Sequence, residues 1–154
     1  MIYEIRTYDL KVRSQTEVLK RFAGAIDKRQ ALSPLVGFFH TDIGMLNQIV
    51  HIWSYDDADH RERVREEAAA TDWWPPKVGE FIIKQTNEIF TPWPGAPKLS
   101  PGTHGPFYEM RNYHIQKGRM DQTRARWDGA LAERTSRSPL LSIMECELES
   151  SHKL

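Results

Sequence analysis

The chain has 154 residues, and its 21 basic and 21 acidic side chains leave no formal net charge at pH 7. A neutral chain lacks the electrostatic field that recruits nucleic acid or an anionic membrane, so neither is an expected partner. Its single cysteine, Cys146, excludes an intrachain disulfide and predicts a reducing compartment such as the cytoplasm. No apolar run approaches the ~20 residues that cross a bilayer, so no membrane span is expected.

The first segment, Ile2–Leu10, alternates between apolar and polar residues, which predicts a β-strand with two unlike faces. Apolar spacing, caps and prolines then predict a helix at 15–31, strands at 35–43 and 47–55, a helix at 57–71 and a strand at 81–90. The order β-α-β-β-α-β predicts an α+β fold of the ferredoxin-like type. Such a fold is one antiparallel sheet with both helices on one face.

The chain also repeats itself at an offset of 105 positions. Ile2–Tyr8 returns as Phe107–Tyr113, and Ser33–Leu35 returns as Ser138–Leu140. The second copy reaches only the counterpart of Ile49, so we expect it to hold a strand, a helix and a second strand at 140–148. The predicted organisation is a ferredoxin-like domain at 1–93, a Pro/Gly-rich linker at 94–106 and a partial second repeat at 107–154.

Four separated blocks of the first copy resemble the NIPSNAP family: Tyr3–Tyr8, Ser33–Gly37, Ile43–Gln48 and Val50–Tyr55. The resemblance implies a dimeric α+β barrel, in which the open sheet faces of a homodimer pack together and enclose a cavity. It implies no single reaction and no cofactor. For a eukaryotic member it also implies a mitochondrial location.

Strand alternation predicts which side chains enter such a cavity. If the helices cover the face of the first strand that carries Tyr3, Ile5 and Thr7, the opposite face points into the barrel. The candidate ligand-binding residues on that face are Glu4, Arg6, Tyr8, His51, Trp53 and Tyr55. A guanidinium that can hold an anionic or enolate oxygen, together with aromatic rings, predicts binding of a small aromatic or acidic molecule.

Three other interpretations are open. In the first, the protein is a cofactor-independent oxygenase or isomerase, with His51 as a proton carrier near neutral pH and with Arg6 and Tyr8 as further catalytic residues. In the second, Glu4 and Arg6 form ion pairs across the subunit interface, and the aromatic rings only fill space. In the third, the protein is an interaction scaffold with an exposed apolar patch on the linker or the second copy.

Two further features carry no predicted site. Arg61, Arg63 and Arg65 alternate with glutamates, which is typical of a solvated helix face. His40 and His51 lack a close-spaced partner set, so no metal is predicted.

Overall fold

The structure is a computed structural model that describes residues 1–146 and 152–153. The chain divides into two compact units, Met1–Glu88 and Ile89–Leu154. Within the described ranges, no helix is both long enough and apolar enough to cross a membrane.

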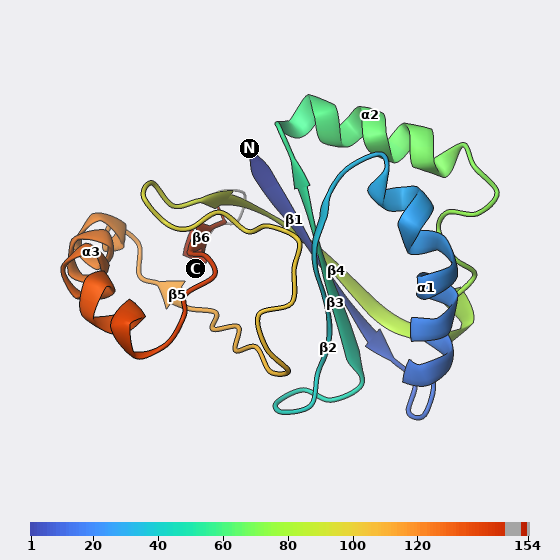
Figure 1. The fold of residues 1–154 in the computed structure, drawn as a ribbon, viewed down its shortest axis with the longest axis horizontal. Coiled ribbons are helices and arrows are strands. Elements are labelled where there is room, and N and C mark those ends of the chain that lie inside the picture. The colour runs from blue at the N-terminus through green and yellow to red at the C-terminus, as the bar shows by residue number, and fades with distance from the viewer. Residues whose placement is uncertain (147–151, 154) are drawn as a thin grey trace. The chain divides into compact units, whose positions relative to one another are not determined.

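The first unit has the predicted element order (Figure 1). Its elements are β1 (Ile2–Leu10), α1 (Gln15–Gln30), β2 (Leu35–His40), β3 (Gln48–Tyr55), α2 (Ala58–Ala69), the 3₁₀ turn η1 (Gly79–Phe81) and β4 (Ile82–Pro92), which continues past the boundary at Glu88. The strand order β2-β3-β1-β4 is that of a ferredoxin-like sheet, and β3 runs antiparallel to both β1 and β2. The predicted α+β class is therefore confirmed.

The register between β1 and β3 brings the predicted site residues to one face. Glu4 lies opposite Trp53, and Arg6 lies opposite His51. Directly opposed residues of an antiparallel pair point to the same side of the sheet. Tyr8 and Tyr55 share this side because they lie an even number of positions away along the same strands.

This shared face is the one that the helices cover, which corrects the sequence-based expectation. Figure 1 shows α1 and α2 on the same side of the sheet. The ring of Phe22 in α1 lies 5.5 Å from that of His51, and Arg61 in α2 donates a hydrogen bond to Glu4. The six candidate residues therefore lie between sheet and helices, not inside a barrel formed by two sheets.

The helices can cover this face of the sheet because its charged side chains neutralise one another. Glu4 is only 1% exposed, and it accepts hydrogen bonds from both Arg6 and Arg61. A buried charge is tolerated when it is paired in this way. Tyr8 and Leu10 supply apolar area on the same face, where Val18 and Phe22 of α1 pack against them.

The second unit contains the helix that the repeat predicts but not the strand expected at 107–113. Its helix, α3 (Met120–Arg137), lies where the repeat placed it. Residues 107–113 do not form the expected strand. The short strands of this unit are β5 (His114–Ile115), β6 (Met144–Glu145) and β7 (His152–Lys153). The end of the strand expected at 140–148 lies outside the described residues.

Candidate functional site

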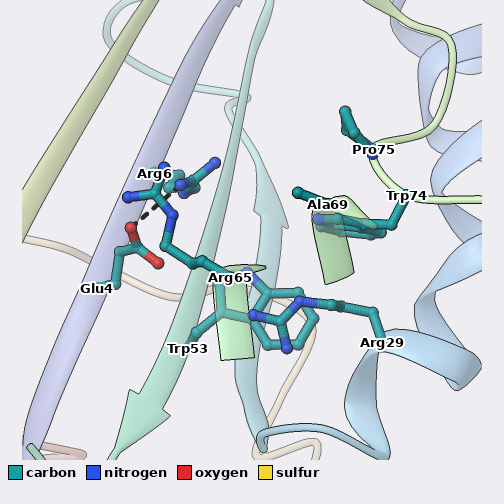
Figure 2. A pocket seen from close by; sticks show the side chains of 8 residues that line it. All are labelled: Glu4, Arg6, Arg29, Trp53, Arg65, Ala69, Trp74 and Pro75. Carbon is teal, nitrogen blue, oxygen red and sulfur yellow. Dashed lines mark hydrogen bonds and ion pairs between the residues drawn. The ribbon is translucent and has the colours of Figure 1, made fainter. Parts of the chain in front are cut away.

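A pocket of about 160 Å³ lies between the sheet and the helices of the first unit (Figure 2). Both helices, the two central strands and the loop after α2 contribute side chains to it. The lining residues are Glu4, Arg6, Arg29, Trp53, Arg65, Ala69, Trp74 and Pro75. Three guanidinium groups and one carboxylate therefore face a space that is walled in part by two indole rings.

The helix α2 presents one face to this site through a four-residue spacing. Arg61, Arg65 and Ala69 are each one turn apart, so they lie on the same side of the helix. Arg61 reaches Glu4, and Arg65 lines the pocket, whereas Arg63 is exposed. The prediction that this arginine run is only a solvated face is wrong for Arg61. The signal that could have found the site is the i, i+4 spacing.

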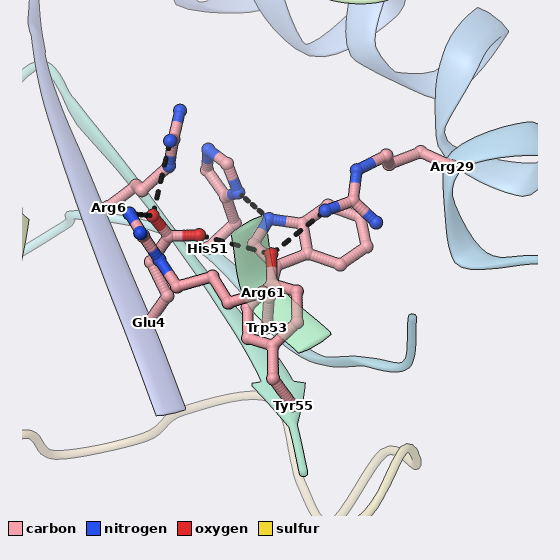
Figure 3. A network of polar contacts seen from close by, with 7 residues as sticks. All are labelled: Glu4, Arg6, Arg29, His51, Trp53, Tyr55 and Arg61. Atoms are coloured by element: carbon pink, nitrogen blue, oxygen red, sulfur yellow. Dashed lines mark hydrogen bonds and ion pairs between the residues drawn. The ribbon is translucent and has the colours of Figure 1, made fainter. Parts of the chain in front are cut away.

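Glu4 is the centre of a buried polar network (Figure 3). Its carboxylate accepts hydrogen bonds from Arg6 at 3.2 Å, from Arg61 at 2.6 Å and from the Tyr55 hydroxyl at 3.1 Å. Burial alone would raise the pKa of Glu4, but the charges and hydrogen bonds of Arg6 and Arg61 lower it to about 2. Glu4 is therefore ionised, and its charge is fully taken up by two guanidinium groups.

Arg29 of α1 has no such partner. It is 2% exposed and donates hydrogen bonds of 2.9 Å to the Ser33 hydroxyl and to the Tyr55 hydroxyl. Its guanidinium carbon lies 4.3 Å from the centre of the Trp53 ring. Within the described residues Arg29 forms no ion pair, and its buried Nε has no hydrogen-bond partner.

Burial lowers the pKa of the Arg29 guanidinium, and the neighbouring Tyr55 and Glu4 offset only part of this effect. A buried cation held by neutral acceptors and a ring face remains short of a compensating negative charge. Arg65 also forms no ion pair with any residue that the structure describes. The pocket thus carries more positive than negative charge.

His51 lies behind this pocket and does not line it. It is fully buried, its ring stacks on that of Tyr8 at 5.2 Å, and its Nδ1 accepts a hydrogen bond from the Trp53 indole. Since Nδ1 is an acceptor, the proton of the neutral ring sits on Nε2. Burial, helped by the charge of Arg6, lowers the pKa of His51 to about 3.

The burial of His51 and its lowered pKa argue against the predicted role as a proton carrier near neutral pH. With Nδ1 occupied and a pKa near 3, the ring stays neutral at pH 7. Through its hydrogen bond, His51 holds the Trp53 indole in place, and the Arg29 guanidinium packs on the face of that indole. Nε2 of His51 has no partner among the described residues.

The six predicted residues thus fall into three groups. Glu4, Arg6 and Trp53 line the pocket, Tyr55 links Glu4 to Arg29, and Tyr8 and His51 pack behind. Sequence reasoning missed the lining residues from helices and loop, which are Arg29, Arg65, Ala69, Trp74 and Pro75. Among the described residues, no group of three or more His, Cys, Asp and Glu side chains is arranged to hold a metal ion.

Comparison with known proteins places this architecture in a family. The NIPSNAP family model matches residues 3–97. The mouse protein NipSnap homolog 3B is 33% identical over 122 residues, an alignment that covers 75% of this chain and 49% of that protein. The chain therefore spans about half the length of the curated relatives it matches.

Solved structures agree with this assignment. A crystal structure of a protein from Agrobacterium tumefaciens is 36% identical, with a TM-score of 0.60, and covers 63% of this chain and 98% of its own. An uncharacterized NIPSNAP domain protein from Burkholderia xenovorans is 30% identical, with a TM-score of 0.59, and covers 63% of this chain and 99% of its own. The chain with the buried arginine pocket belongs to the NIPSNAP family.

Proposed function

We propose that this protein binds a small anionic molecule in the pocket between the sheet and the helices of its first unit. The observation that carries the proposal is Arg29, which is 2% exposed and has no carboxylate partner among the described residues. Transfer of an unpaired charge from water into a protein interior costs several kcal/mol. A bound anion would supply the missing charge.

The other lining groups support the same conclusion. Arg65 adds a second guanidinium without an ion pair, and Arg6 shares Glu4 with Arg61. Guanidinium groups bind carboxylate oxygens in pairs of parallel hydrogen bonds, so they suit oxyanions. The site offers no base near neutral pH, because His51 is neutral and lies outside the pocket. We therefore propose that the pocket binds an anion, in preference to catalysing an oxygenase or isomerase reaction.

Replacing Arg65 tests this proposal with little risk to folding, because its side chain is exposed at the helix surface. Sodium acetate, benzoate and phosphate are titrated against the protein at constant ionic strength, with the melting temperature as the readout. We expect at least one of them to stabilise the protein, and Arg65→Gln to weaken that anion's binding at least about tenfold, since a hydrogen bond to a charge contributes about 1.5–3 kcal/mol.

Arg63→Gln is the matched control, because Arg63 lies on the same helix, is exposed and does not line the pocket. It should bind the anions like the unaltered protein. Stabilisation by none of the three anions, or equal weakening in both variants, would contradict the proposal.

We also propose that the protein is a homodimer through the sheet face that the helices leave uncovered. That face carries Tyr3, Ile5, Val50 and Ile52, which are only 0–8% exposed within a single chain, so a second copy would have to take the place of the residues that bury them. Native mass spectrometry of the purified chain at low micromolar concentration is expected to show twice the mass of one chain. A monomer would contradict this proposal.

An interaction scaffold is a second candidate, which the exposed segment at 107–113 favours. Phe107 is 79% exposed and Met110 is 47% exposed, although this sequence repeats that of a buried strand. A chain that ends after Trp93 is expected to keep its fold, measured by circular dichroism, and to lose any protein partner captured by the full chain. Retention of that partner by the shorter chain would rule out this role for the segment.

The compartment we propose is the cytoplasm, on the ground that the single Cys146 forms no disulfide and is buried. Cell fractionation that finds the protein elsewhere would overturn this assignment.

A further inference from the structure

We infer that the anion bound in this pocket is the carboxylate of a single-ring aromatic compound. This inference rests on the proposed function and narrows it to one chemical class. Three properties of the pocket lead to it: its volume, its aromatic wall and the distribution of its charges.

The volume limits the ligand to one ring. The pocket measures about 160 Å³. A closed cavity of ~150 Å³ admits benzene, so the enclosed part of this pocket accepts one six-membered ring, whereas a fused pair of rings would extend beyond it. The pocket is also partly open on the side of α2, where the exposed Arg65 lies, which leaves room for a substituent there.

The wall favours an aromatic ring over an aliphatic chain. Trp53 and Trp74 meet edge to face at 5.9 Å, and Ala69 and Pro75 add apolar surface beside them. Arg29 covers one face of Trp53, and its guanidinium carbon also lies 5.6 Å from the centre of the Trp74 ring. A flat ring can pack against the remaining surface of Trp74 and against Pro75 with the offset or edge-to-face geometry that aromatic pairs prefer.

The charges favour a carboxylate over a phosphate. Arg6 and Arg65 come from β1 and α2, and Arg29 approaches from α1, so donors are present on several sides (Figure 2). The ionised Glu4 lies beside Arg6, at a distance of 3.2 Å, and repels a doubly charged group more strongly than a singly charged one.

Isothermal titration calorimetry tests the inference with four probes: benzoate, acetate, 2-naphthoate and phenyl phosphate. We expect benzoate to bind at least tenfold more tightly than each of the others. Equal affinity for acetate would overturn the aromatic part, and tighter binding of phenyl phosphate would overturn the carboxylate; in either case the anion-binding proposal would stand. Tighter binding of 2-naphthoate would overturn the single-ring limit. Binding of none of the probes would overturn both proposals.

A pair of tryptophan variants separates ring recognition from folding. Trp74→Leu is expected to weaken benzoate at least fivefold while acetate binds as before, which shows that the pocket is still formed. Trp73→Leu is the control, because Trp73 lies next to it in the chain but does not line the pocket. Equal losses in the two variants, or a parallel loss of acetate in Trp74→Leu, would contradict ring recognition by Trp74.

Discussion

Replacing Glu4 with glutamine is expected to lower the free energy of unfolding by about 3–5 kcal/mol, because it removes one side of a buried charge pair. Arg6 and Arg61 would lose the carboxylate that both contact, at 3.2 Å and 2.6 Å. A neutral amide cannot compensate two guanidinium groups in a site where the residue it replaces is 1% exposed. Urea denaturation measures the change.

The internal repeat provides a matched control for this substitution. Glu109 is the counterpart of Glu4, and it forms an ion pair with Arg111 at 2.9 Å. That pair is exposed, so Glu109→Gln should leave the stability unchanged within error. If the two variants unfolded at the same urea concentration, the buried network would not be a source of stability.

The same network predicts how stability depends on pH. The folded-state pKa of Glu4 is about 2, below the unfolded value of 4.5. The contribution of Glu4 to the free energy of unfolding is therefore complete above pH 4.5 and is lost as the pH falls towards 2. His51, whose pKa is lowered to about 3 from 6.5, adds a loss that begins below pH 6.5. Glu4→Gln should flatten the lower part of this profile only, and an unchanged profile would contradict the assignment.

Replacing Arg29 with methionine is expected to have the opposite effect on stability. The ligand-free variant should be more stable by about 1 kcal/mol or more, because an uncompensated buried charge is replaced by an apolar side chain of similar length. The loss of hydrogen bonds to Ser33 and Tyr55, each 2.9 Å long, offsets part of this gain. Binding of the anion should weaken at least about tenfold, since a charge-assisted contact is lost.

Calorimetry and urea denaturation of the same sample measure both effects. The control is Arg134→Met, since Arg134 is the counterpart of Arg29 in the second copy and lies outside the pocket. Arg134→Met should change neither the free energy of unfolding nor the affinity for the anion. A less stable Arg29→Met protein that binds anions normally would mean that Arg29 is only a structural residue.

Strand periodicity was enough to predict three of the eight residues that line this pocket. Glu4, Arg6 and Trp53 share a face because side chains alternate along a strand and because a ferredoxin-like order places β1 beside β3. Alternation along the strands does not predict which face of the sheet the helices cover. Both faces of β1 are partly apolar, and the burial of Glu4 is favourable because Arg6 and, from α2, Arg61 both pair with it.

The residues from outside the sheet were not predictable from alternation. Arg29 lines the pocket because of the rotation of α1, and Trp74 does so because of the path of the loop after α2. Neither property follows from a strand pattern. The strand expected at 107–113 is not formed, because alternation within one segment does not supply the partner strand that a strand needs.

A crystal structure of the protein grown with 4-bromobenzoate tests the central claim most directly, because bromine gives an anomalous signal that locates the ligand without ambiguity. We predict one strong bromine peak between the sheet and the helices, with the carboxylate in contact with Arg6, Arg29 or Arg65. A peak on the opposite sheet face, near Tyr3 and Ile5, would contradict this account and would place the site inside a barrel of two sheets. The absence of any peak at saturating ligand would contradict anion binding by this pocket.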